Sequence, residues 1–165
     1  MKKIILLVVA LVFVNFAKAQ QSVVKVNPLG IAFGVINATY EKALSESGAL
    51  EIGASYFNWS SIGVSGLGGD VAYRFYFSKN NDAPEGIYAA PLVGVNSLTY
   101  KDDSNNETAL FISLGAKAGY QWIFDSGLAL DLYFGYGKYI SGGFDDYSGF
   151  SAGRPILGVA VGYAF

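Results

Sequence analysis

The sequence contains no histidine and no cysteine in its 165 residues. Without these residue types the chain cannot build Ser-His-Asp or Cys-His catalysis, imidazole general-base chemistry, or ordinary zinc and copper sites. The absence of cysteine also excludes a disulfide framework, so an exported chain would depend on closed hydrogen bonding for its stability. We therefore predict a protein that is not an enzyme, with no catalytic residue, no metal site and no cofactor.

A surplus of positive charge is also absent. The chain has 11 Lys and Arg against 13 Asp and Glu, which gives a net charge of −2, and no basic patch is available for nucleic acid. Asp102-Asp103 and Asp145-Asp146 could bind calcium weakly, but they lack the EF-hand spacing, and solvated loop charge is the simpler interpretation. The glycines of Gly66-Leu67-Gly68-Gly69 do not make a phosphate loop, because no helix follows and no Lys or Ser stands at the required place.

Long hydrophobic runs are missing everywhere except at the start of the chain. Met1-Lys2-Lys3 gives a positive segment, Ile4 to Phe16 an apolar segment, and Ala17-Lys18-Ala19 a small-x-small cleavage site, which together are typical of a secretory signal peptide. A membrane-spanning helix needs roughly 20 apolar residues, and this run is shorter. We predict a cleavable signal peptide at residues 1–19 and a single domain at residues 20–165.

What remains is abundant hydrophobicity in alternation. Hydrophobic residues make up 52% of the chain and aromatic residues 16%, yet beyond the first 20 residues they recur every second position, the period of a β-strand. Polar turn clusters separate the alternating runs at Ser45 to Gly48, Asn58 to Ser61, Ser78 to Glu85, Lys101 to Glu107, Asp125 to Gly127 and Ser141 to Gly153.

These six clusters define seven extended segments, of which the first is too long. Val23 to Leu44 is about twice the roughly 9–11 residues of a spanning strand, so we expect it to fold into two strands. Asn27-Pro28-Leu29-Gly30 and Gly34 are the two places where it could reverse, although a turn at the former leaves a very short first strand. The predicted fold is an all-β, eight-stranded antiparallel up-and-down transmembrane barrel, with the placement of the hairpin in residues 22–36 left open.

The last stretch of the chain shows the alternation most clearly. One face is wide and apolar, whereas the residues between are only Gly158, Ala160, Gly162 and Ala164. A strand with lipid outside and a crowded lumen inside has this pattern. Ending on an aromatic residue, the segment resembles the terminal strand of Gram-negative outer-membrane barrels, and the resemblance implies that its apolar face is the C-terminal membrane-insertion signal. Its members are Leu157, Val159, Val161, Tyr163 and Phe165.

Carried through the other strands, the alternation predicts an aromatic girdle and a charged interior. An exported barrel begins and ends on the periplasmic side, so we assign the C-terminus to the periplasm. The girdle lies near this periplasmic rim, where interfaces favour amphipathic rings, and comprises Tyr73, Phe75, Phe77, Tyr120, Trp122 and Phe124. The opposite face carries ionisable residues that could not stand in lipid, namely Lys25, Glu41, Glu51, Asp70, Arg74, Lys117 and Asp131. It also carries the neutral polar residues Asn37, Thr39, Ser55, Asn96, Ser113 and Gln121.

Three cations facing four anions favour a salt-bridge network that fills a narrow lumen, since an eight-stranded barrel is just wide enough for side chains to fill. The alternative is a polar transport path. Most glycines in the strands fall on this inward face, where they make room for large residues. Pairing across Asp125 to Gly127 places Tyr133 opposite Gly119, so we expect that ring to cover the bare backbone.

Val159 to Phe165, together with the signal peptide, resembles the small eight-stranded outer-membrane barrels of the OmpX and OmpA transmembrane-domain kind and, more distantly, the OmpW kind. Val26 to Gly30 followed by Asn37 to Glu41 also resembles the opening of outer-membrane proteins of this size. The resemblance implies a Gram-negative outer-membrane location, with membrane lipid and the barrel insertion machinery as partners. It names no partner for the surface loops.

The sequence leaves three functions open. The first is an integral outer-membrane protein with a plugged lumen and a structural or surface-interaction role through the loops at Lys101 to Glu107 and Ser141 to Gly153. The second is a narrow, porin-like channel or carrier for small, including apolar, molecules. The third is a soluble, exported lipocalin-like barrel, which requires the opposite facing, with aromatic residues inside and polar residues outside.

Overall fold

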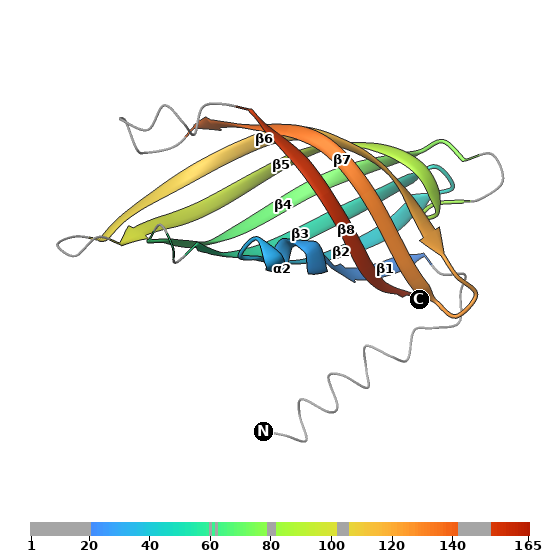
Figure 1. The fold of residues 1–165 in the computed structure, drawn as a ribbon. Coiled ribbons are helices and arrows are strands. Elements are labelled where there is room, and N and C mark those ends of the chain that lie inside the picture. Colours follow the sequence, from blue (N-terminus) through green and yellow to red (C-terminus); the bar gives the residue numbers. More distant parts are fainter. Residues whose placement is uncertain (1–20, 60, 62, 79–81, 102–105, 142–152) are drawn as a thin grey trace, which may run out of the picture.

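The protein folds into a closed barrel of eight antiparallel strands in sequence order, with β1 pairing with β8 (Figure 1). The computed structural model describes residues 21–59, 61, 63–78, 82–101, 106–141 and 153–165. This architecture confirms the predicted all-β, eight-stranded up-and-down barrel. Its elements are β1 (Ser22–Val26), α2 (Pro28–Ala32), β2 (Val35–Ser45), β3 (Gly48–Trp59), β4 (Val64–Tyr76), β5 (Gly86–Lys101), β6 (Asn106–Ile123), β7 (Leu128–Ser141) and β8 (Arg154–Ala164).

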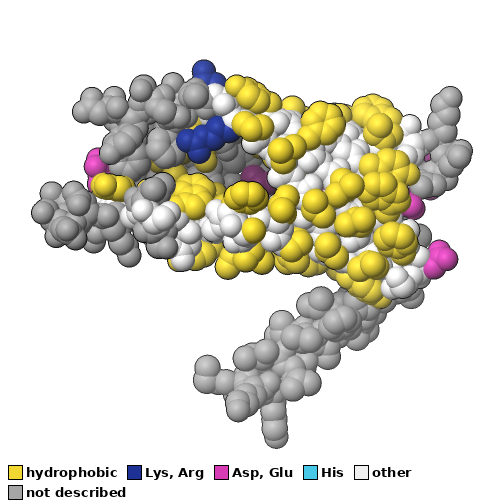
Figure 2. Space-filling view, viewed as in Figure 1, with side chains coloured by type: hydrophobic (Ala, Val, Ile, Leu, Met, Phe, Trp, Pro, Cys, Tyr) yellow, Lys and Arg dark blue, Asp and Glu magenta, His cyan; other side chains and the backbone are white. Residues whose placement is uncertain are grey.

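The facing of the strands is apolar outside and charged inside. Large hydrophobic side chains such as Leu67, Phe134 and Leu157 are 65–69% exposed on the outer surface, and they cover the barrel in the space-filling view (Figure 2). Lys25 and Glu41, in contrast, are at most 1% exposed. This is the reverse of the facing that the lipocalin-like alternative requires.

The connection between the two strands of the first hairpin is longer than a simple turn and contains a short helix. β1 is only five residues long, and it is followed by the one-turn helix α2. Asn27 caps that helix by accepting a hydrogen bond from Gly30 N at 3.0 Å, and Pro28 occupies its first turn, where a missing N–H is harmless. Gly34 then reverses the chain with a φ of +74°. The long first segment does form two strands, and both candidate reversal points lie within the connection.

The connection between β4 and β5 is long because it folds inward. Ala83 is 7% exposed, and its N–H donates to Glu46 O at 2.8 Å, which ties this turn to the one between β2 and β3. Gln121 on β6 donates from Nε2 to Pro84 O at 2.5 Å. The described part of this turn therefore packs inside the barrel at the end where the C-terminus lies.

The strand register confirms one predicted pairing and corrects its consequence. Tyr133 lies opposite Gly119 across β6 and β7. However, the side chain that stands where a Cβ on Gly119 would be is that of Tyr88, 2.8 Å away at its hydroxyl. The Tyr133 ring instead lies against Gly158 of β8. The expectation that Tyr133 covers Gly119 is wrong, because a ring in a twisted barrel can lean toward either neighbouring strand.

The part of the chain that the structure describes contains no helix that is both long and apolar enough to cross a membrane.

Candidate functional site

Six ionisable side chains from six different strands meet in the lumen, and we call this set the charged floor. Each is at most 9% exposed, and three cations face three carboxylates. Only β5 and β8 contribute none. Because an isolated buried charge is very unfavourable, such a set is tolerated only when its members pair and their hydrogen bonds are satisfied. The members are Lys25, Glu41, Glu51, Arg74, Lys117 and Asp131.

Lys25 joins the short strand β1 to three other strands. Its Nζ lies 2.6 Å from Glu41 Oε2, 3.0 Å from Glu51 Oε2 and 3.1 Å from Asp131 Oδ2. The three carboxylates belong to β2, β3 and β7. One ammonium group thus ties the two ends of the barrel wall together from the inside.

Arg74 is the centre of the charged floor. Its guanidinium pairs with Glu51, with Asp131 Oδ2 at 2.7 Å and with Glu41 Oε2 at 3.3 Å, and it stacks 4.1 Å from the centre of the Tyr88 ring. Within the described residues, its Nε is the one buried side-chain polar atom without a hydrogen-bond partner. Removing this side chain would leave three buried carboxylates short of a counter-charge.

Lys117 lies on the side of the charged floor that faces away from the C-terminal end of the lumen. Its Nζ pairs with Glu51 Oε1 at 2.5 Å and lies 4.8 Å from the centre of the Tyr133 ring. Glu51 is therefore shared by three cations.

Neutral polar groups complete the hydrogen bonding of the floor. Gln121 Oε1 accepts from Lys25 Nζ at 2.7 Å and from Arg74 Nη1 at 3.2 Å. The hydroxyl of Tyr76 donates to Glu41 Oε1 at 2.5 Å, and that of Tyr88 donates to Asp131 Oδ1 at 2.8 Å. The strand alternation places Gln121, Tyr76 and Tyr88 on the inward face, but it does not indicate which carboxylate each hydroxyl contacts.

Asp70 is the member of the predicted charge set that stands apart. Among the described residues it takes part in no ion pair and no hydrogen bond. Its carboxylate lies against Gly53, its pairing partner across β3 and β4, where a Cβ would be 2.6 Å from Oδ1. The structure thus brings six of the seven predicted charged residues together, and the seventh, Asp70, lies outside the charged floor.

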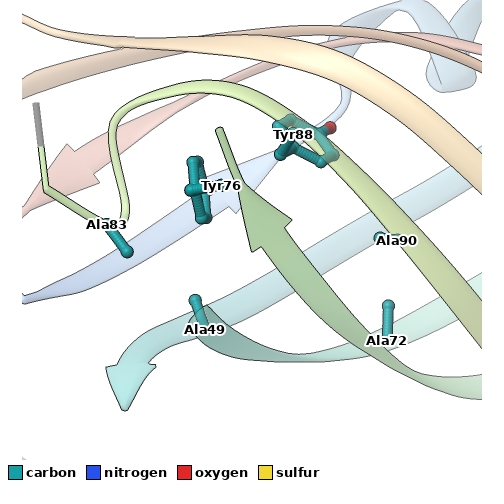
Figure 3. Packing of buried hydrophobic residues seen from close by; sticks show 6 residues of the cluster. All are labelled: Ala49, Ala72, Tyr76, Ala83, Tyr88 and Ala90. Carbon is teal, nitrogen blue, oxygen red and sulfur yellow. The ribbon is translucent and has the colours of Figure 1, made fainter. Parts of the chain in front are cut away.

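Below the floor, an apolar layer fills the lumen. Ala49, Ala72 and Ala90 provide small side chains around the rings of Tyr76 and Tyr88, whose centres are 5.5 Å apart. Figure 3 shows these side chains directed toward one another, with Ala83 of the inward-folded turn beside them. This layer and the charged floor both lie toward the C-terminal end of the lumen, and their side chains are buried. We call that end the inner half and the other end the outer half.

In the outer half the lumen is open. A cavity of about 420 Å³ lies above the charged floor, within the range of roughly 300–1,000 Å³ that is usual for ligand pockets. Neutral polar side chains line its middle, and Phe57, Trp59, Tyr139 and Ile156 line its outer part. The neutral polar residues are Asn37, Thr39, Ser55, Asn96 and Ser113.

The wall of this outer half is interrupted. The pairing of β1 with β8 ends at Val26 and Val161, although β8 continues to Arg154. Helix α2 packs between β8 and β2 in place of a longer β1, but among the described residues no backbone hydrogen bond joins it to residues 155–160. Figure 2 shows a hollow on this side of the barrel, with acidic atoms visible at its depth.

The predicted girdle and insertion signal lie on the outer face near the C-terminal end. The centres of the Tyr73 and Phe75 rings are 4.7 Å apart, and those of Tyr120 and Trp122 are 4.5 Å apart. The girdle is completed by Phe77 and Phe124, both exposed, which sit at the turns after β4 and β6. In the terminal segment the exposed members are Leu157 and Tyr163, while Val159 and Val161 are half-buried.

Phe165 closes the chain by pairing with β1. Its N–H donates to Ser22 O at 2.8 Å, and its carbonyl accepts from Ser22 N at 3.0 Å. The alternate residues Gly158 and Gly162 face inward, where Tyr133 and Lys25 fill the space beside them.

Nothing in the described ranges groups three or more acidic side chains so that they could hold a metal ion. The acidic pairs Asp102-Asp103 and Asp145-Asp146, and most of the loop at Ser141 to Gly153, lie outside the described residues.

Known structures share this fold. The crystal structure of Neisserial surface protein A matches with a TM-score of 0.59 and 12% identity, covering 88% of this chain and 94% of that one. The N-terminal β-barrel domain of Pseudomonas aeruginosa OprF matches with a TM-score of 0.55 and 15% identity, covering 90% of this chain and all of that one. At these identities the likeness shows the fold of small outer-membrane barrels. No curated protein sequence matches the chain, while a model for a family of unknown function matches residues 4–163.

Proposed function

The chain belongs to the DUF3575 family of proteins of unknown function, and we propose that it is an integral outer-membrane barrel with a plugged lumen and no enzymatic activity. Its role on this proposal is structural or surface-interactive, carried by the loops at the end opposite the C-terminus. Outer-membrane lipid and the barrel insertion machinery are its partners.

The observation that carries the proposal is the combination of an apolar outer face with a filled inner lumen. Exposed side chains such as Ile52, Val93 and Leu132 would be unfavourable in water over so large an area. The burial of the charged floor, with Arg74 and Glu51 at 1% and 0% exposure, supports a plugged lumen. A passage through the static barrel is therefore not supported.

The experiment expresses the chain with residues 1–19 attached in a Gram-negative host and follows its location and its conductance. We expect recovery in the outer-membrane fraction, a gel mobility that changes on heating, and no conductance steps in planar bilayers. Recovery as a soluble periplasmic protein would overturn the membrane assignment. Steady conductance that changes in Arg74→Ala or Lys117→Ala would instead favour the channel.

A further inference from the structure

We infer that the cavity in the outer half is a binding site for a single-chain membrane amphiphile whose head group is positively charged and donates hydrogen bonds. The ligand enters sideways from the bilayer, between α2 and the outer part of β8. Its head lies above the charged floor near Asp70, and its chain leaves over the apolar edge of the opening. This goes beyond the proposed structural role of the barrel.

The opening lies within the thickness of the membrane. Five strand residues span roughly 17 Å at about 3.3 Å each, and less along the membrane normal because barrel strands are tilted, whereas the apolar band of such barrels is about 25 Å tall. β1 starts at the C-terminal rim, where Ser22 pairs with Phe165. It therefore ends partway through the band, and the interruption above it faces lipid.

Backbone at this depth must be satisfied or covered. The edge of β8 from Pro155 to Ala160 has no strand partner on the β1 side, and unpaired strand edges do not occur in contact with hydrocarbon. Pro155 removes one donor from this edge. The remaining groups are acceptable only because they border a cavity that holds water or a ligand, so the edge is the rim of an entrance.

The rim is apolar on both sides of the interruption. Ile31 and Phe33, at the end of α2, are 58% and 69% exposed, and Leu157 on β8 is 69% exposed. Trp59 anchors this rim by donating from Nε1 to Phe33 O at 2.8 Å. Side chains of this kind suit a hydrocarbon chain that passes from the lumen into the bilayer.

The interior suits a head group instead of a chain. The walls above the floor carry hydroxyl and amide groups, among them Ser113 and Asn96. The charged floor is balanced, and Asp70 adds one further negative charge beside it, in a space with low-dielectric walls. Arg154 and Lys138 also line the cavity, and both stand near the outer ends of their strands, β8 and β7. Lys117 is the nearest floor cation on that side, but it is already paired with Glu51. An ammonium head would supply both the charge and the donors that Asp70 lacks.

The two tryptophans of the chain allow a direct test. Trp59 lines the cavity, whereas Trp122 lies on the outer face. In Trp122→Phe, refolded into vesicles of uncharged lipid, we expect a chain-brominated alkylammonium to quench Trp59 fluorescence with a saturating dependence on its mole fraction. In the matched variant Trp59→Phe, quenching of Trp122 should rise without saturating. Absence of a saturating phase at Trp59 would overturn the site.

The preference of the cavity for a positively charged head group is tested in the Trp122→Phe background. A chain-brominated alkyl sulfate should show no saturating phase, and Asp70→Asn should weaken alkylammonium binding about tenfold, as expected for loss of one charge-assisted hydrogen bond. Equal saturation by both probes, or binding unchanged by Asp70→Asn, would overturn the head assignment.

Filling the cavity provides the final control. Ser113→Phe should abolish the saturating phase, while Leu110→Phe, at an exposed position on the outer face of the same strand, should leave it unchanged. Folding of each variant is checked by its heat-dependent gel mobility, and Ser55→Phe replaces Ser113→Phe if that variant does not fold. Saturable quenching that survives both fillers would place the ligand elsewhere and overturn the site. Each variant is refolded into vesicles, so failure of the proposed cellular location would not alter these results.

Discussion

The inner and outer halves of the lumen are enclosed by the same strands, yet they are filled in opposite ways. In the inner half, Tyr88 and Arg74 are at most 1% exposed and the charged floor reaches across the barrel. The outer half contains a cavity of about 420 Å³ lined by short polar side chains. The boundary between them coincides with the end of β1, whose residue Lys25 belongs to the floor.

In this barrel, the part of the lumen that side chains fill is also the part where the strands form a complete wall. Where all eight strands are present, the interior is narrow enough for side chains to fill. Where β1 stops and α2 replaces it, the side chains inside become short and the wall is interrupted. Substitutions in the two halves should therefore have very different effects on stability, and the predictions below test that contrast.

Arg74→Ala should have the largest effect, because it leaves Glu41, Glu51 and Asp131 buried with too few cations. We expect a loss of about 3–5 kcal/mol of unfolding free energy or a failure to fold, measured by urea denaturation in lipid vesicles. The control Lys138→Ala removes an exposed cation at the other end of the barrel and should change little. Equal stability of the two variants would show that the floor is not the stabilising element of the inner half.

Lys117→Met should have a smaller effect at the upper edge of the floor. Glu51 keeps Arg74 and Lys25 as partners, so the loss is that of one hydrogen-bonded ion pair, about 1.5–3 kcal/mol. The same denaturation measurement checks it. A loss as large as that of Arg74→Ala would mean that Lys117 is part of the centre of the floor.

Gly158→Ala tests the packing between a ring and a bare strand. A Cβ at this position would collide with the Tyr133 ring, and we expect a loss of about 1–3 kcal/mol from overpacking. Gly69→Ala is the matched control, because its nearest contact would be Gly53 O at 3.7 Å. If the control destabilises the barrel as much as Gly158→Ala does, the cause is the backbone and not the ring.

Ser113→Ala should have the smallest effect, within about 0.5 kcal/mol. Its side chain is half-buried and lines the cavity. The midpoint of thermal unfolding, compared with that of the unsubstituted protein, measures this. A loss of more than about 1 kcal/mol would show that the outer half is packed like the inner half, and the contrast between them would fail.

Most of the architecture could be predicted from the sequence because strand alternation determines which residues share a face. The strand number follows from the polar turn clusters and the length of the first segment, whereas the apolar exterior and the inward position of Lys25 and Arg74 follow from a period of two. Pairing inside the lumen could not be predicted in the same way. Whether Asp70 or Asp131 meets Arg74 depends on the twist and stagger of the barrel, which the alternation does not contain.

The features missed in the sequence are short and local. Asn27-Pro28 carries a helix-start signal, with a capping side chain and a proline in the first turn, but it is equally typical of a turn, and one helical turn is too short to show a period. The inward fold of Ala83 and Pro84 has no pattern at all. The only indication in the sequence is that the segment from Ser78 to Glu85 is longer than a hairpin connection requires.

Lys25 has a consequence for the order in which the barrel assembles. It reaches Asp131 across 106 positions of the sequence, and Val23 to Val26 pair with Ala164 to Val161, so these contacts require the two ends of the chain to meet. Such long-range contacts form late, since loop closure must precede them. Until the seam closes, the carboxylates of Glu51 and Asp131 lack one of their cations. Joining of the seam and neutralisation of the interior therefore become a single cooperative event, which disfavours a barrel that is inserted but left unsealed.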